Sequence, residues 1–205
     1  MKLLVATNNM GKLREFNKIL GELGIECVSL KDMGINIDVE EDGKTFLENA
    51  KIKAEEVFKI AGIPTVSDDS GLEVDALFGE PGVYSARYAG THGDDEANNR
   101  LLLEKLKDVP DEKRTARFKC AIYLVMSEDK HYFSEGSAEG FILHSKKGEN
   151  GFGYDPLFFS SDLKKGFAQA SDEEKNSVSH RGKALRGLKK KLEEDNIKIW
   201  ATMSR

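Results

Sequence analysis

Cysteine is scarce in this sequence. Cys27 and Cys120 are the only two among 205 residues, they lie far apart, and each stands among apolar neighbours. This pattern contains neither a zinc-ligand spacing nor the dense cysteine framework of a small disulfide-rich protein. The sequence therefore predicts two buried free thiols in a reducing compartment.

Long apolar runs and an excess of basic residues are also missing. No stretch approaches the roughly 18 apolar residues of a membrane-spanning helix, and no signal peptide precedes the first strand-like residues. The formal net charge is -5, so any phosphate group has to bind at a local basic cluster rather than in an overall positive field. We therefore expect a cytoplasmic protein that binds neither membranes nor nucleic-acid polymers.

The residues that are present are typical of an α/β protein. A hydrophobic fraction of 39% and a charged fraction of 33% suit a globular enzyme or binding domain. Periodicity and capping signals predict strands at 2–6, 25–29, 117–126 and 131–145, the last two as a hairpin, and helices at 12–23, 45–61, 94–107 and around 184–192, with a loop-rich region at 146–179. From this order we expect one α/β domain over residues 1–205, with a mixed sheet flanked by helices and two lobes around a central cleft.

The first candidate site is the loop TNNMGK, residues 7–12. A strand that feeds a glycine-containing loop, with Lys12 opening a helix, creates an anion site from helix N–H groups and an ammonium. The spacing of a Walker motif is absent. In the alternative interpretation, Asn8 or Asn9 caps the helix and Lys12 is a surface charge.

Two pairs of carboxylates form the second candidate site. In TVSDDSGLEVDAL, Asp68 and Asp69 come soon after the strand-like residues Ile63, Thr65 and Val66, and Glu40 and Glu41 precede the second helix. Adjacent carboxylates repel unless a cation or water separates them, and magnesium takes such oxygen ligands beside substrate phosphates. The alternatives are a solvated turn at the aspartates and an acidic helix start at the glutamates.

The segment GENGFGYDPLFF, residues 148–159, predicts a shaped loop. Phe152 and Tyr154 offer faces for stacking a base, and Asp155 or the loop backbone could hydrogen-bond to its edge. Alternatively, the loop is a turn whose aromatic rings enter the core.

The segment NSVSHRGKAL, residues 176–185, places basic side chains at the start of a helix. Cations are disfavoured there by the helix dipole, so His180, Arg181 and Lys183 indicate an anionic or polar ligand. A solvated basic cluster is the alternative.

The motifs TNNMGKLREF, VEEDGKTFLENAKIKA, SDDSGLEVDAL with PGVYSARYAG, GFGYDPLF and SHRGKAL follow one another along nearly the whole chain. Together they resemble the non-standard purine nucleoside triphosphate pyrophosphatases, also called inosine triphosphate or dITP/XTP pyrophosphatases. The resemblance implies a magnesium-dependent hydrolase that cleaves ITP, dITP or XTP between the α- and β-phosphates, in preference to ATP and GTP. It also implies an elongated mixed sheet with flanking helices, two lobes and a central cleft, and usually a homodimer.

The resemblance further implies residue roles. Asp69 would be the proton acceptor, assisted by Asp68, and Glu40 with Asp69 would hold Mg²⁺, although Glu41 competes for the place of Glu40. Substrate would be contacted by Thr7, Asn8, Asn9, Met10, Gly11, Lys12, Lys53 and Ser70, with Phe152, Gly153, Tyr154, Asp155, Lys175, His180 and Arg181 around the base.

Two rival functions follow from the same motifs. One is a pyrophosphatase for modified pyrimidine or methylated nucleotides, against which the SHRGKAL and GFGYD segments speak. The other is a nucleotide sensor without catalysis, for which the adjacent Asp68 and Asp69 have little use.

Overall fold

The computed structural model describes residues 1–195 and contains a seven-stranded sheet. The strands are β1 (Lys2–Val5), β2 (Glu26–Ser29), β3 (Thr65–Val74), β4 (Thr115–Ser127), β5 (Lys130–Ile142), β6 (Phe158–Ser160) and β7 (Lys165–Gly166), in the order β2-β1-β3-β4-β5-β6-β7. Strand β1 pairs in parallel with β2 and β3, whereas β6 pairs antiparallel with β5 and β7. The predicted mixed sheet is therefore confirmed.

Four of the five α-helices described in residues 1–195 were predicted. They are α1 (Met10–Leu20), α2 (Phe46–Ala61), α3 (Asp95–Lys105) and α5 (His180–Glu194). The described residues also form short 3₁₀ turns at Gly21–Leu23, Asp75–Leu77, Gly82–Arg87, Asp111–Lys113, Asp155–Leu157 and Phe167–Gln169. The fifth, α4 (Asp172–Val178), falls in the region expected to be loop. Its signal was present, because Ser171 and Glu174 form a capping box at its start.

Strand β3 overturns one interpretation of the aspartate pair. It continues from Thr65 to Val74 without a break, so the solvated turn suggested for Asp68 and Asp69 is wrong. Asp68 is buried, as is the preceding Ser67, whose hydroxyl donates to the carbonyl oxygen of Ala50. Polar residues are tolerated inside this strand because backbone and side-chain groups of other elements supply their partners.

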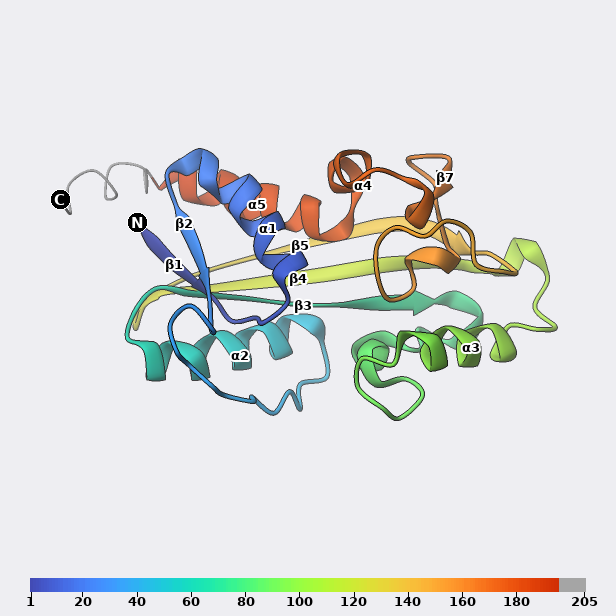
Figure 1. The fold of residues 1–205 in the computed structure, drawn as a ribbon, viewed down its shortest axis with the longest axis horizontal. Coiled ribbons are helices and arrows are strands. Elements are labelled where there is room, and N and C mark those ends of the chain that lie inside the picture. The colour runs from blue at the N-terminus through green and yellow to red at the C-terminus, as the bar shows by residue number, and fades with distance from the viewer. Residues whose placement is uncertain (196–205) are drawn as a thin grey trace. The chain divides into compact units, whose positions relative to one another are not determined.

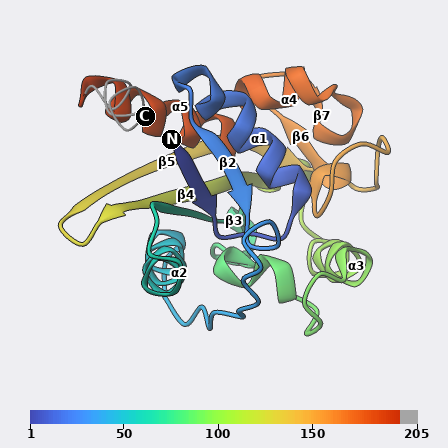
Figure 2. The ribbon, with the colours of Figure 1, turned by 60° about the vertical axis from the view of Figure 1, so that its left-hand side comes forward.

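The described residues form two compact units, of which unit 1 comprises residues 1–69, 121–136 and 182–195. Within it, α1 and α5 lie on one face of the strands and α2 lies on the other (Figures 1 and 2). Helix α2 begins where predicted: the Thr45 hydroxyl accepts from the N–H of Glu48 at 3.1 Å, and the Glu48 carboxylate accepts from that of Thr45 at 3.2 Å. The capping box thus fixes the point at which the acidic loop passes into the helix.

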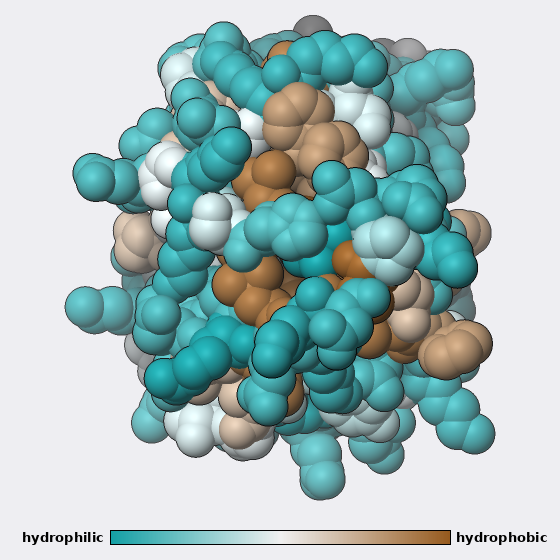
Figure 3. All heavy atoms as spheres, turned by 90° about the vertical axis from the view of Figure 1, so that its right-hand side faces the viewer, coloured by the Kyte–Doolittle hydropathy of each residue, from teal (hydrophilic) through white to brown (hydrophobic). Residues whose placement is uncertain are grey.

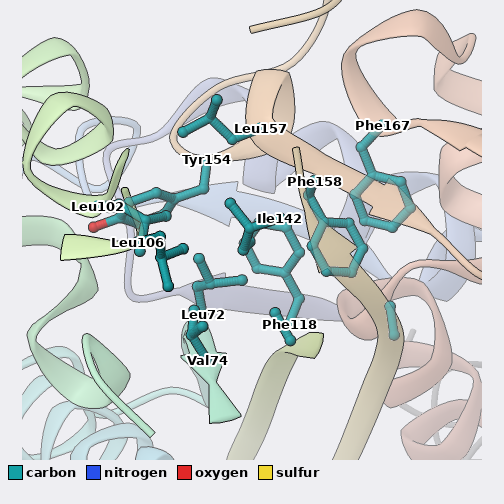
Figure 4. Close-up of a cluster of buried hydrophobic side chains, with 12 residues drawn as sticks. Leu72, Val74, Leu102, Leu106, Phe118, Ile142, Tyr154, Leu157, Phe158 and Phe167 are labelled. Atoms are coloured by element: carbon teal, nitrogen blue, oxygen red, sulfur yellow. The ribbon is translucent and has the colours of Figure 1, made fainter. Parts of the chain in front are cut away.

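Unit 2 comprises residues 70–120 and 137–181. Helices α3 and α4 lie on opposite sides of its strands (Figure 1). Its core gathers aliphatic and aromatic side chains from β3, β4, β5 and the region after residue 153 (Figure 4). The ring of Phe158 lies between those of Phe118 and Phe167, at centroid distances of 4.7 and 4.8 Å. This aromatic packing anchors the loop that precedes Phe158.

The molecular surface is mostly hydrophilic on the face shown in Figure 3, with apolar side chains visible in a central region. Within residues 1–195, no helix has both the length and the apolar character needed to cross a membrane. Cys27 and Cys120 are both buried and neither forms a disulfide, as predicted.

Candidate active site

The loop before α1 brings Lys12 to an aspartate. Asn9 caps the helix, since its Oδ1 accepts from the N–H groups of Gly11 at 2.8 Å and Lys12 at 3.2 Å, and the Thr7 hydroxyl accepts from the N–H of Asn9 at 3.1 Å. The capping interpretation is therefore confirmed. Lys12 is more than a surface charge, because its Nζ lies 3.1 Å from Oδ1 of Asp68, whose side chain is 1% exposed.

Asp69, the next residue in β3, is a mostly buried carboxylate with a perturbed pKa. Its Oδ2 accepts a hydrogen bond of 3.0 Å from Nδ2 of Asn49 on α2. Burial, with a smaller contribution from the negative charge of Glu41, raises the pKa of Asp69 to about 6 against the opposing effects of Asn49, Lys12 and Lys53. A carboxylate that changes protonation near neutral pH is suited to accept a proton in catalysis.

Glu41 and Lys53 complete this group of charges. The Glu41 carboxylate pairs with the ammonium of Lys53 on α2, and Glu41 also repels the charge on Asp69. Glu40, by contrast, has an exposed side chain. Glu41 is thus the glutamate of this loop whose charge acts on Asp69.

A divalent cation fits this donor set. Asp69 and Glu41 present hard carboxylate oxygens whose mutual repulsion raises the pKa of Asp69, and a cation between them would remove that repulsion. Magnesium usually needs only one or two protein carboxylates, with waters and substrate phosphates as further ligands. Within residues 1–195, no three acidic, histidine or cysteine side chains form a metal-binding group by themselves.

Asn49 is a site residue that the sequence interpretation missed. Its Nδ2 holds Asp69, while its Oδ1 accepts from the N–H of Gly43 at 2.8 Å. A Cβ atom at Gly43 would lie only 2.6 Å from that oxygen, so glycine permits the approach. Its position in the helical pattern could have indicated it, because a polar residue on the apolar face of α2, beside Ala50, needs a buried partner. Asn49 is 1% exposed.

In unit 2, the two aromatic residues of the glycine-rich loop take opposite positions. Phe152 is 45% exposed and lies under two cations, with Lys175 Nζ 4.9 Å and Arg181 Cζ 5.9 Å from its ring centroid. Tyr154 is buried in the core cluster (Figure 4), and its hydroxyl donates to the carbonyl oxygen of Ser85 at 2.8 Å. The stacking interpretation thus suits Phe152, and the core interpretation suits Tyr154.

Asp155 and Lys175 form a buried ion pair that shapes the same loop. Lys175 Nζ lies 2.5 Å from Asp155 Oδ2, which also accepts from the N–H of Phe152 at 2.9 Å. A Cβ atom at Gly151 would lie 2.2 Å from that carboxylate oxygen, which explains the glycine. Asp155 is thus engaged inside the protein, where it organises the loop.

The first turn of α5 is buried, so a solvated basic cluster is wrong for His180 and Arg181. The His180 ring stacks on Phe118 with centroids 4.8 Å apart and planes 13° from parallel. The Arg181 guanidinium donates to the hydroxyl of Ser70 at 3.0 Å. Ser70 immediately follows Asp69 in β3.

Several of the predicted residues form one group in each unit. Unit 1 brings together Lys12, Glu41, Lys53, Asp68 and Asp69, whereas Glu40 is exposed. Unit 2 brings together Ser70, Phe152, Asp155, Lys175 and Arg181, whereas Tyr154 and His180 pack against the core. Asn8 and Met10 are exposed residues of the first loop.

Fold and site define an α/β protein whose strand β3 carries two adjacent carboxylates near two lysines. Residues 3–191 match the Ham1 family, and the chain belongs to it.

Two curated relatives are similar over nearly their whole length. A dITP/XTP pyrophosphatase of Geobacter sulfurreducens is 53% identical, and the match covers 93% of this chain and 96% of the relative. A dITP/XTP pyrophosphatase of Clostridium perfringens is 48% identical, and the match covers 96% of this chain and 97% of the relative. The Ham1 protein structure from Staphylococcus aureus is 42% identical with a TM-score of 0.86, covering 95% of this chain and all of that one. The crystal structure of a nucleoside-triphosphatase (dITP/XTP pyrophosphatase) from Mycobacterium abscessus is 49% identical with a TM-score of 0.76. The match covers 92% of this chain and 98% of that one.

Proposed function

We propose that this protein is a magnesium-dependent nucleoside-triphosphate pyrophosphatase. It hydrolyses ITP, dITP and XTP to the nucleoside monophosphate and pyrophosphate, and so removes them from the cytoplasmic nucleotide pool. The observation that carries the proposal is a group of charged side chains around one carboxylate. The charges of Glu41, Lys12 and Lys53 all act on the carboxylate of Asp69. The names of relatives about half identical in sequence support the substrate class.

The lysines and the carboxylates have different roles in binding the triphosphate. Lys12 and Lys53 supply ammonium groups that bind phosphate oxygens. Asp69 and Glu41 would hold the magnesium ion, which when bound would neutralise charge that develops on the leaving pyrophosphate. Asp68 keeps Lys12 in place through their ion pair.

Asp69 also moves the proton. Its carboxylate takes a proton from a water molecule as the water oxygen attacks the α-phosphorus in line. The bond from that phosphorus to the oxygen bridging the α- and β-phosphates then breaks, and pyrophosphate leaves with the bonding electron pair. Asn49 holds Oδ2 of Asp69 during this step, so the carboxylate keeps one orientation.

Selection of the base belongs to the residues around Phe152. Its exposed ring offers a face for a purine, and stacking of this kind contributes about 1–3 kcal/mol in nucleic-acid binders. The guanidinium of Arg181, which lies over the same ring, offers N–H donors for a 6-keto oxygen. Against the 6-amino group of adenine such donors remain unpaired, at a cost of about 1–3 kcal/mol for each buried group.

We also propose that the enzyme works as a homodimer. The support in this chain is Phe78, a fully exposed aromatic residue held at a φ of 54° at the end of a 3₁₀ turn. Sedimentation equilibrium of the wild type and of Phe78→Ser checks this. A wild type that sediments as a monomer at micromolar concentration contradicts it.

A substrate panel tests the function. The purified protein is incubated with magnesium and each of ITP, dITP, XTP, ATP and GTP, and the products are separated as monophosphate, diphosphate, pyrophosphate and phosphate. We expect pyrophosphate and monophosphate from the first three, little from ATP and GTP, and loss of turnover with excess EDTA. Equal turnover of all five would remove the specificity, and release of phosphate with a diphosphate would refute the proposed bond cleavage.

A further inference from the structure

Helix α3 sends two consecutive asparagines to two different loops of unit 2. Asn98 and Asn99 are each 2% exposed. Asn98 holds the segment after the 3₁₀ turn at 82–87, because its Oδ1 accepts from the N–H of Ala89 at 2.8 Å. Asn99 instead holds the glycine-rich loop, because its Nδ2 donates to the carbonyl oxygen of Gly153 at 2.8 Å.

Gly153 is held at both of its backbone polar groups. In addition to the bond from Asn99, its N–H donates to Oδ2 of Asp95, one turn earlier in α3, at 2.7 Å. Gly153 adopts a φ of 61°, a conformation that glycine reaches without strain. Two bonds from one helix to one residue fix both the position and the direction of this peptide segment.

The amide of Asn99 has only one workable orientation. Its nitrogen faces two carbonyl oxygens, that of Gly153 and that of Asp95 at 2.7 Å, and only an NH₂ group can donate to both. As a consequence, Oδ1 of Asn99 is buried without a hydrogen-bond partner among the residues that the structure describes. One buried side-chain oxygen is thus left without a partner, while the nitrogen of the same amide makes two hydrogen bonds, one of which holds the loop.

The adjacent residue is fixed from the opposite side. The N–H of Phe152 donates to the buried carboxylate of Asp155, which is paired with Lys175. Residues 152 and 153 are consecutive, so each end of the short segment that carries the Phe152 ring has its own anchor. Without the anchors on α3, the backbone of this segment would be held from the Asp155 side and not at Gly153.

We propose that Asp95 and Asn99 are positioning residues for base recognition: they hold Gly153 so that the Phe152 ring presents one fixed face to a purine. The inference rests on the proposed function, since it takes the loop at 148–159 as the base-binding element. Neither residue touches the substrate. Both act through Gly153, and neither lies in a motif that carries the family resemblance.

Four variants test this role. Asn99→Ala removes the donor, and Asn98→Ala is its matched control, because it removes a neighbouring asparagine of equal burial that holds a different loop. Asp95→Ala removes the exposed acceptor with little risk to folding, and Asp95→Asn keeps an acceptor oxygen. Each is measured for Tm, for kcat and KM with ITP and ATP, and for binding of inosine monophosphate by calorimetry.

We expect Asn99→Ala to raise the KM for ITP about tenfold with a smaller change in kcat, because a displaced binding group acts mainly on positioning. The ratio of kcat/KM for ITP to that for ATP should fall by a similar factor, and inosine monophosphate should bind more weakly. Asn98→Ala should lose a comparable amount of Tm and keep the ratio. Asp95→Ala should raise the KM for ITP and lower the ITP-to-ATP ratio less than Asn99→Ala does. Asp95→Asn keeps an acceptor oxygen, so both values should stay near those of the wild type.

The outcomes separate this inference from the proposed function. If Asn99→Ala lowers Tm but leaves the ITP-to-ATP ratio and monophosphate binding unchanged, the role is structural only and the inference is refuted. An equal change of the ratio in Asn98→Ala refutes it as well. If the wild type releases no pyrophosphate yet binds inosine monophosphate, the proposed function fails, and selective weakening of that binding in Asn99→Ala still supports the inference. A wild type that binds no inosine monophosphate and turns over no ITP refutes both.

Discussion

The side-chain amide of Asn49 joins Asp69 to Gly43: its nitrogen donates to Asp69 Oδ2 at 3.0 Å, and its oxygen accepts from the N–H of Gly43 at 2.8 Å. One residue of α2 thus orients the proposed proton acceptor in β3 and also holds the end of the acidic loop. The carboxylate of Asp69 and the loop that carries Glu41 therefore depend on the same side chain.

Asn49→Ala should lower kcat by about tenfold to a hundredfold, the range seen when an outer partner of a metal-binding carboxylate or histidine is removed. Steady-state kinetics with ITP at saturating magnesium measure it. Asn17→Ala is the control, because Asn17 also makes two side-chain bonds of 3.0 Å, in its case to the backbone of Cys27. It should cost stability and leave kcat near the wild-type value. Equal kcat losses in both variants would show that the effect of Asn49 is general.

The two glutamates of the acidic loop should differ in their effect on the metal requirement. Glu41→Gln removes a carboxylate that acts on Asp69, so we expect the magnesium concentration for half-maximal rate to rise about tenfold or more. Glu40→Gln changes an exposed side chain and should leave it unchanged. Magnesium titrations of the rate decide between them. The reverse result would assign Glu40 as the ligand.

Local signals predicted much of the fold. The Thr45–Glu48 capping box marked the start of α2, and the apolar stripe of α1 was visible in the spacing of Leu13, Phe16 and Leu20. Helix α4 was missed although Ser171 and Glu174 carried the same kind of signal, because a seven-residue helix offers too short a period to recognise.

The site was less predictable, for a physical reason. Asp68 and Asp69 are poor strand formers, so local propensity left a solvated turn open as the alternative where β3 in fact continues. What allows the strand is supplied from elsewhere, by Lys12 and by Asn49, which is 20 residues from Asp69 in the chain. Partners such as Asn49 for Asp69 or Asn99 for Gly153 exist only once the chain is folded, and a single sequence does not state them.

The ion pair of Lys12 with buried Asp68 should matter for stability as well as for binding. Lys12→Met leaves the Asp68 carboxylate buried without its ammonium, so the free energy of unfolding at pH 7 should fall by about 3 kcal/mol. Lys51→Met is the control, since Lys51 forms an exposed pair with Glu55 at 3.9 Å and should cost less than about 1 kcal/mol. Urea unfolding measures both.

Combining Lys12→Met with Asp68→Asn should restore most of the stability and none of the activity, because the phosphate-binding ammonium is still missing. Recovery of turnover in the double variant would remove Lys12 from the phosphate site. A single variant as stable as the wild type would show that the pair contributes little.

Phe152 should set the affinity for the base. Phe152→Ala removes a ring that is 45% exposed beneath Lys175, and the KM for ITP should rise about tenfold to a hundredfold, the equivalent of one stacked base. Phe152→Trp should retain most of the affinity. Phe141→Ala, which removes another partly exposed ring of unit 2, serves as the control. An unchanged KM in Phe152→Ala would exclude stacking on this ring.

Asp69→Asn should abolish turnover and yet stabilise the metal-free protein at neutral pH. The pKa of Asp69 is about 6 in the folded state against an ordinary value of 3.8, so the folded state binds the proton more tightly than the unfolded state. The contribution of this group to stability is therefore fully present below about pH 4 and is lost as the pH rises to 6. By pH 7 the ionised carboxylate costs about 3 kcal/mol, which the neutral amide avoids.

Unfolding in urea with EDTA should therefore show Asp69→Asn to be more stable than the wild type by up to about 3 kcal/mol at pH 7, with the difference vanishing toward pH 4. Magnesium should stabilise the wild type and not the variant, because it binds to the carboxylate that the substitution removes. Turnover of ITP should fall by at least about a hundredfold, since the proton acceptor is gone. A variant that keeps wild-type turnover would refute the role of Asp69 in catalysis. One that loses turnover but is no more stable at pH 7 would show instead that the folded protein does not hold this carboxylate at a raised pKa.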